Sequence, residues 1–395
     1  MNVDVSVPTH ETIRGWMQRV GLARMRLAKK EAGGTWLVDH TNQIGPEKVL
    51  TVLRVRSAPP DGVALRHSDV EVLAVLPGTQ SKREDVARDY ARLAARFGTP
   101  ANVVTDGAVE LRESVQALQN QRKMPRVFRD PKHVLANKLE ALLKQDADYE
   151  AFSRRLGSSR AALQQTELAH FTPPPFKTKA RFMNLQPTIR WAAAALWHLN
   201  HPDSASCRDV SRERLEEKLG WLRDFADGIV RWQNCQAVIS TTLTFLNQRG
   251  LFQGVVKAYQ TLTAGLAACP ASRELITHMA TWLGGYEQQL KPGERLPLST
   301  EILESSFALY KELEQQHSKS GFTNLLLAFP TLLRKTNATE VAACFAAIKV
   351  ADVRAWTQEH FPSTLTSRRQ RMYREAKPKR KLATQKRATQ LLSTT

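Results

Sequence analysis

Three acidic residues occupy positions from which one fold could bring their carboxylates together. Asp39 ends the β-branched run that starts at Thr35, Asp106 follows the apolar run 101–105, and Glu304 lies early in a helical pattern near residue 300. An acid at the end of a strand is held on a rigid element, and its carboxylate points into the crevice beyond the sheet, where ligands of α/β folds bind. We therefore expect the three side chains to converge.

Carboxylates that converge in this way predict a site for divalent metal ions. Three negative charges around one point repel each other unless a cation neutralises them, and hard oxygen ligands suit Mg²⁺ or Mn²⁺. Two such ions, about 3.5 to 4 Å apart, can activate the attacking oxygen and stabilise the leaving oxygen of a phosphodiester. Asp39, Asp106 and Glu304 therefore predict in-line phosphoryl transfer with two bound ions.

The elements that must position these acids follow from the hydrophobic pattern. Residues 10–31 have a basic, loosely helical pattern, and they form an N-terminal segment over 1–32. From residue 33 to about 150 the pattern predicts the order β-β-β-α-β-α-β-α, with the first two strands over 35–39 and 48–55. This order predicts an α/β fold, a mixed sheet with helices on its faces.

The rest of the chain divides into three parts. Residues 151–295 lose the strand signal and predict an all-helical insertion, and 296–362 return to the sheet with the helix that carries Glu304. Residues 363–395 form a basic tail, because ten Lys or Arg residues and a single acid, Glu375, lie between Arg368 and Arg387.

The composition predicts a polyanionic partner. The chain of 395 residues carries 57 Lys and Arg against 38 Asp and Glu, a net charge of +19, and Lys and Arg displace counterions from phosphates. Its four cysteines form no CxxC pair, which argues against zinc knuckles and disulfides. The sequence shows neither a membrane span nor a secretory signal, so we expect a cytoplasmic, nucleoid-associated protein that binds double-stranded DNA.

Four runs of the sequence resemble those of DDE transposases from bacterial insertion sequences. They are Thr35-Trp36-Leu37-Val38-Asp39-His40-Thr41, Val104-Thr105-Asp106-Gly107, Asp130-Pro131-Lys132-His133 and Glu301-Ile302-Leu303-Glu304-Ser305-Ser306-Phe307-Ala308-Leu309-Tyr310-Lys311. The resemblance covers most of residues 10–335. It implies an RNase H-like catalytic domain with a helical insertion before the Glu, and the metal-binding triad Asp39, Asp106 and Glu304. It also implies DNA strand cleavage and strand transfer by a homodimer or larger synaptic assembly on element ends and target DNA.

Further basic and polar residues extend this resemblance. Lys311 follows Glu304 with the E-x6-K spacing of some DDE transposases, and seven residues return a helical side chain to within about 20° of the same face. Lys311 could thus hold a DNA phosphate beside the metal site. Asp130 and His133 resemble the C/D-x2-H element, whose family role lies close to the scissile phosphate.

Some alternatives remain open at the level of sequence. Glu301 is the rival to Glu304, although its place in the first turn has a helix-dipole explanation. Asp130 could simply cap a helix, and His133 could be structural. A proline-rich turn carries Lys177, Lys179 and Arg181, which either track a DNA backbone or form a solvated loop.

The N-terminus departs from the family pattern. Transposases of this kind usually carry a helix-turn-helix module there, whereas about thirty residues precede the first predicted strand. Two alternatives to a transposase follow: a transposase-derived DNA-binding protein without catalysis, and a structure-specific nuclease on the same fold.

Overall fold

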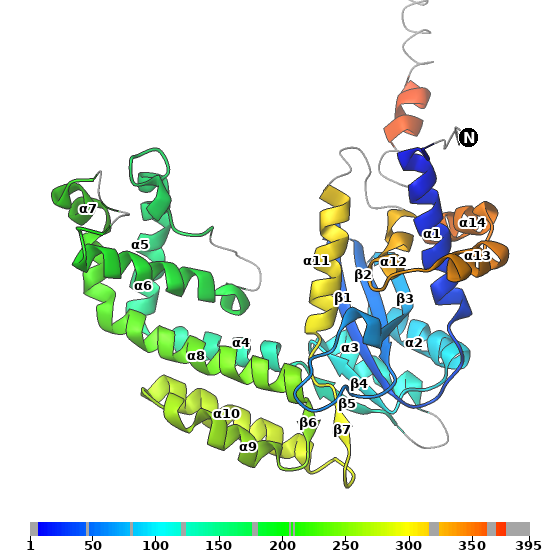
Figure 1. Cartoon of the computed structure of the whole chain (residues 1–395), viewed down its shortest axis with the longest axis horizontal. Helices are drawn as coiled ribbons and strands as arrows, with labels where there is room; N and C mark the ends of the chain where they lie inside the picture. The colour runs from blue at the N-terminus through cyan, green and yellow to red at the C-terminus, as the bar shows by residue number, and fades with distance from the viewer. Residues whose placement is uncertain are drawn as a thin grey trace, which may run out of the picture.

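The chain forms a lobe built around a β-sheet and a helical lobe that extends away from one edge of the sheet (Figure 1). The computed structural model describes residues 7–44, 47–79, 82–119, 124–175, 181–204, 207, 210–315, 324–361 and 369–376. None of the helices in these ranges is both long and apolar enough to span a bilayer.

A five-stranded mixed sheet lies at the centre of the first lobe, in the order β3-β2-β1-β4-β5. The strands are β1 (Thr35–Ile44), β2 (Glu47–Val55), β3 (Val70–Thr79), β4 (Asn102–Thr105) and β5 (Arg126–Arg129). The first three strands are antiparallel, whereas β4 and β5 run parallel to β1. The predicted mixed sheet and its order of elements are confirmed.

The first strand is longer than the sequence predicts. We expected it to end at Asp39, but β1 continues to Ile44 because β2 goes on pairing with it beyond that point. Its parallel pairing with β4 does stop at Val38, opposite Thr105. Asp39 therefore ends the parallel part of β1 but not the strand.

Both faces of the sheet are covered, which explains the nearly continuous apolar runs of its strands. Trp36 and Val38 pack on one face with Tyr90 of α2 (Arg83–Phe97), and Leu37 packs on the other with Leu135. The short helices α3 (Val109–Glu113), η1 (His67–Asp69) and η2 (Ser114–Leu118) fill the connections between strands. The sheet is thus a rigid support for the residues at its strand ends.

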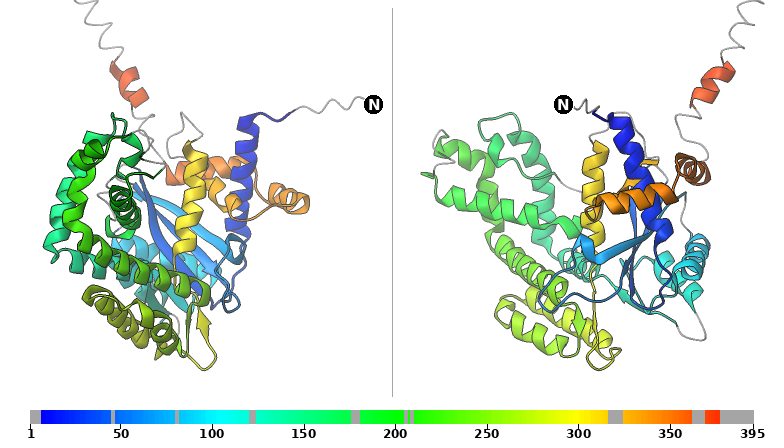
Figure 2. Two further views of the ribbon diagram at one scale, coloured as in Figure 1. Left: turned by 60° about the vertical axis from the view of Figure 1, so that its left-hand side comes forward. Right: turned by 45° about the vertical axis from the view of Figure 1, so that its right-hand side comes forward.

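The basic N-terminal helix is part of this lobe. It is α1 (His10–Leu27), and it packs against η8 (Asn324–Ala328), α12 (Phe329–Leu332), α13 (Ala338–Ala347) and α14 (Val350–His360). Figure 2 shows α1 beside these C-terminal helices in both views. A Cβ at Gly21 would lie 1.6 Å from the carbonyl oxygen of Leu327, so only glycine allows this approach.

Several cations of α1 serve this packing. Arg19 donates hydrogen bonds to the carbonyl oxygens of Ile348 and Phe345, and Arg24 pairs with Glu340 at 3.0 Å. These guanidinium groups are therefore occupied within the fold.

Residues 131–287 build the helical lobe, with the short 3-10 turns η3 (Ala169–Phe171), η4 (Arg181–Asn184), η6 (Gly220–Phe225) and η7 (Ala264–Leu266) between longer helices. The helices are α4 (Pro131–Leu143), α5 (Ala147–Leu163), α6 (Gln186–Asn200), α7 (Arg212–Leu219), α8 (Ala226–Arg249), α9 (Val255–Thr263) and α10 (Pro270–Glu287). The aromatic rings of Phe152, Trp221 and Trp232 form part of its core.

The sequence predicts that residues 151–295 are entirely helical, but the helical lobe also contains short strands. Two short antiparallel strands, β6 (Leu251–Phe252) and β7 (Arg295–Leu296), pair at its base. Gly250 has a φ of +63°, which ends α8 and lets the chain approach Leu296. After β7 the chain enters α11 (Glu301–Gln315), which lies against β1.

Candidate active site

Two of the predicted acids are neighbours on adjacent parallel strands. Val38 of β1 and Thr105 of β4 form the last parallel pair of these strands. Asp39 and Asp106 each follow a residue of this pair, so the two acids are close neighbours at this point of the sheet. Both residues are half-buried.

A tight turn fixes the orientation of Asp106. Its Oδ1 accepts the N–H of Ala108 at 2.8 Å, and Gly107 between them has a φ of +95°. A Cβ at Gly107 would also lie 2.3 Å from the side chain of Arg129. The Asp-Gly pair in the sequence thus has a physical reason, because a larger residue would disturb the turn that holds the carboxylate.

The third acid reaches the same region from α11. Glu304 lies in the first turn of this helix, is half-buried, and belongs to an element that packs on β1. Burial, together with the negative charges of Asp106, Glu304 and Asp130, raises the pKa of Asp39 to about 7. Asp106 and Glu304 are therefore both within electrostatic reach of Asp39.

Glu304 pairs with Lys132, a residue whose role the sequence did not reveal. The ammonium group of Lys132, in the first turn of α4, donates a hydrogen bond to Oε2 of Glu304. Lys132 lies inside the run Asp130-Pro131-Lys132-His133, but its partner is 172 positions away, so no local pattern reveals the pair. The cation neutralises one of the three acids.

Asp130 joins the helices that carry Lys132 and Glu304. Its Oδ1 accepts the N–H groups of Lys132 and His133 at 2.8 and 3.3 Å, which caps α4. Its Oδ2 accepts the N–H and the hydroxyl of Thr300 at 2.6 and 2.8 Å, directly before α11. Asp130 is only 2% exposed and Thr300 1% exposed. We call this arrangement the Asp130 clamp.

The clamp changes the interpretation of the Asp130-His133 element. Each carboxylate oxygen of Asp130 already accepts two hydrogen bonds. Asp130 therefore holds the starts of α4 and α11 together and is not free to contact DNA. The side chain of His133 is half-buried. The sequence marks Thr300 as a possible helix cap, because it lies just before a predicted helix. Its hydrogen bonds to Asp130 could not be read from the sequence.

The remaining predicted residues are less closely connected to the three acids. Lys311 lies on α11 two turns after Glu304 and is exposed. Lys177 and Lys179 lie outside the described residues, and Arg181 is described only as the backbone that starts η4. Of the basic tail predicted over 363–395, residues 369–376 form an exposed helical segment, and 363–368 and 377–395 lie outside the described residues.

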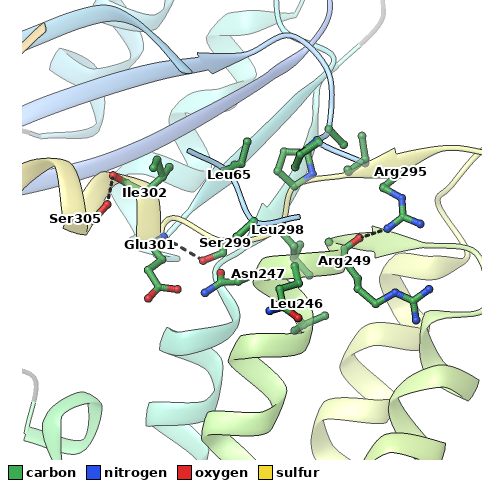
Figure 3. Close-up of a pocket in the computed structure, with 17 residues that line it drawn as sticks. Leu65, Leu246, Asn247, Arg249, Arg295, Leu298, Ser299, Glu301, Ile302 and Ser305 are labelled. Atoms are coloured by element: carbon green, nitrogen blue, oxygen red, sulfur yellow. Dashed lines mark hydrogen bonds between the residues drawn. The ribbon is translucent and has the colours of Figure 1, made fainter. Parts of the chain in front are cut away.

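A cavity of about 280 Å³ lies beside the start of α11 (Figure 3). Glu301, the rival to Glu304, lines it together with Leu65 and Asn247. Nearby, the Nε2 atom of His67 lies 3.1 Å from the hydroxyl of Ser305, and Asp61 forms ion pairs with Arg249 and Arg295. These contacts attach the β2–β3 connection to both α11 and the base of the helical lobe.

The donor set suits a hard divalent cation, but the side chains are not gathered around one point. Among the described residues, no group of three or more His, Cys, Asp or Glu side chains is placed to hold a metal ion. Asp39 and Asp106 nevertheless supply carboxylate oxygens of the kind that Mg²⁺ and Mn²⁺ prefer, and burial together with the neighbouring negative charges raises the pKa of Asp39. Glu304 would have to exchange its ion pair with Lys132 for a metal.

Comparison with known proteins gives distant similarity to solved structures. No protein-family model matches the sequence, and no curated protein matches it. A solved structure described as the Drosophila P element transposase strand transfer complex aligns with a TM-score of 0.39 and 8% sequence identity, over 85% of this chain and 87% of the other. A similarity at this level does not show a shared family.

Proposed function

We propose that the chain is a DDE transposase that cleaves and joins DNA strands with divalent metal ions at Asp39, Asp106 and Glu304. The sheet order β3-β2-β1-β4-β5, with Asp39 and Asp106 directly after the last parallel pair of β1 and β4, supports an RNase H-like catalytic domain. The observation that carries the proposal is that Asp39 lies within electrostatic reach of Asp106 and Glu304, which come from distant parts of the chain. Burial, together with these negative charges, raises the pKa of Asp39 to about 7. Perturbed acids of this kind are typical of functional sites.

Each residue of the site has a role in this proposal. Asp39 and Asp106 bind metal from the rigid sheet, and Glu304 completes the site from α11. When bound, Mg²⁺ or Mn²⁺ would supply a lowered pKa for the attacking water or 3′-hydroxyl and stabilise charge on the phosphodiester. Lys132 pairs with Glu304, and Lys311 lies two turns further along α11, so both cations suit DNA phosphates near the site.

The partners follow from the same proposal. The net charge of +19 fits binding of double-stranded DNA at element ends and target. Because two ends must be processed together, we expect a homodimer or a larger synaptic assembly, acting at the nucleoid. We propose in addition that the DNA element moved by this enzyme is a bacterial insertion sequence.

Cleavage of supercoiled and linear DNA with Mg²⁺ or Mn²⁺ tests the assignment. The unaltered protein is compared with Asp39→Ala, Asp106→Ala and Glu304→Ala, and with Asp224→Ala, an exposed acid of the helical lobe, as the matched control. We expect cleavage to be lost in the three site variants and kept in the control, while DNA binding survives in all four. Cleavage that persists in Asp106→Ala contradicts the assignment.

One observation favours a second candidate, a DNA-binding protein without catalysis. The ion pair between Lys132 and Glu304 satisfies one acid without a metal. Mn²⁺ affinity measured by calorimetry separates the candidates without any DNA. Binding that is lost in Asp39→Ala supports the transposase, whereas an unaltered protein that binds DNA and no Mn²⁺ supports the second candidate.

A further inference from the structure

Thr51 of β2 lies directly opposite Asp39 in the sheet. The two residues pair across the antiparallel strands β1 and β2, which are neighbours in the first lobe (Figure 1). Directly opposite residues of an antiparallel pair have their side chains on the same face and their Cβ atoms about 4.5 to 5.5 Å apart. The side chain of Thr51 is therefore a close neighbour of the Asp39 side chain.

The hydroxyl of Thr51 has no hydrogen-bond partner among the described residues. Thr51 is 0% exposed, and its Oγ1 is buried without a partner. Its other neighbours on this face of the sheet are apolar and buried: Val49 and Leu53 along β2, and Val75 opposite it on β3. Asp39 is thus the polar residue among those that flank Thr51 in the sheet.

The packing of the sheet gives no reason for a hydroxyl at position 51. Valine has nearly the same shape as threonine and also favours strands, and it would bring no polar atom into this apolar layer. A buried hydroxyl that lacks a hydrogen bond lowers stability. A cost of this kind is expected where a residue serves a functional site.

The chemistry of the Thr51 hydroxyl suits the Asp39 carboxylate. A threonine hydroxyl can donate one hydrogen bond, and an ionised carboxylate only accepts them. A hydrogen bond to an ionised acceptor is stronger than one between neutral groups. Carboxylates that bind metal ions are commonly held by such donors, which fix the orientation of the carboxylate.

We propose that Thr51 is a positioning residue for the metal site. When Asp39 binds a metal ion, the Thr51 hydroxyl donates a hydrogen bond to the Asp39 carboxylate and holds it in the orientation that binds the ion. Thr51 acts through Asp39 and is not itself a ligand. This inference rests on the proposed function, because it requires metal binding by Asp39.

The affinity of the full chain for Mn²⁺, measured by calorimetry without DNA, tests the role of Thr51. Thr51→Val removes the hydroxyl and keeps the shape of the side chain. We expect the dissociation constant of this variant for Mn²⁺ to rise by about tenfold or more, which is the usual effect of losing a partner of a metal ligand. Thr51→Ser keeps the hydroxyl and should restore most of the affinity.

Stability separates this role from a structural one. The urea midpoint of Thr51→Val should equal or exceed that of the unaltered protein, because the variant removes a buried hydroxyl without a partner. Thr35→Val, four residues before Asp39 on β1, is the matched control. Thr35 is 3% exposed, and its hydroxyl accepts a hydrogen bond from Asn102 at 3.3 Å. This control should lower the urea midpoint and leave the Mn²⁺ affinity unchanged.

Three results would overturn the proposal, and they differ in what they leave standing. Equal Mn²⁺ affinity of Thr51→Val and the unaltered protein removes the role of Thr51 and keeps the metal site. Equal losses of affinity in Thr51→Val and Thr51→Ser also remove this role, because they would show an effect of packing. An unaltered protein that binds no Mn²⁺ overturns the metal site itself, and the role of Thr51 with it.

Discussion

The ends of the sheet strands and the helical lobe treat their acids in opposite ways. At the sheet, the negative charges of Asp106 and Glu304 act on Asp39, and burial together with this repulsion raises the pKa of Asp39. In the helical lobe, Glu216 pairs with Arg223, and the hydrogen bond from this arginine holds the pKa of Glu216 below its ordinary value.

The fold therefore leaves Asp39 beside other acids at the sheet, whereas Glu216 in the helical lobe has a neighbouring cation. Ion pairs on an exposed helical surface contribute little, and they leave no charge that needs a ligand. Like charges held together on a rigid sheet destabilise the fold, and such conflicts between stability and local charge are expected at functional sites.

The largest effect is expected for Glu304→Gln. If Glu304 is a ligand at the metal site, single-turnover DNA cleavage should fall by at least about a thousandfold, because electrostatic stabilisation of the transition state is lost. Glu301→Gln, one turn away and facing the cavity of Figure 3, is the matched control and should stay within about tenfold of the unaltered rate. The reverse order of the two variants would assign the site to Glu301.

Loss of the Asp130 clamp should have the next largest effect. Asp130→Ala leaves the N–H groups at the start of α4 and the buried Thr300 without their acceptor, so the free energy of unfolding should fall by about 3 kcal/mol. Urea denaturation measures it, with Asp224→Ala as the control. A loss below about 1 kcal/mol would show that the clamp does not hold these helices.

Asp39→Asn should change the pH dependence of stability. The folded pKa of about 7 lies above the ordinary value of 3.8, so the folded state binds more protons between these pH values, and stability falls as pH rises through this window. The asparagine variant should be more stable than the unaltered protein at pH 8, by about 1 to 2 kcal/mol for this half-buried site. Urea titrations at pH 5 and pH 8 measure it, and a similar difference at both values contradicts the raised pKa.

The smallest effect is expected in the helical lobe. Glu216→Gln breaks the ion pair with Arg223 but keeps the size of the side chain, and both side chains are largely exposed. The free energy of unfolding should change by less than about 1 kcal/mol, and less still at high salt. A change of about 2 kcal/mol or more would remove the contrast between the two regions.

Most of the local helices and strands could be predicted from the sequence. The β-branched run before Asp39, the Asp-Gly pair at 106–107 and the helical pattern around Glu304 follow from short-range steric and hydrophobic preferences. The mixed sheet of the first lobe could be predicted for the same reason. The extension of β1 to Ile44 and the pair β6–β7 could not, because they depend on which neighbouring strand is present.

Which charged and polar side chains contact each other depends on the tertiary structure. Lys132 and Glu304 are 172 positions apart, and Asp130 and Thr300 are 170 apart, so no periodicity links them. The arginines of α1, which the sequence presents as a basic surface, are partly used to hold the C-terminal helices. Hydrogen bonds and ion pairs depend on distances of a few ångströms, and these distances are set by packing of the whole chain.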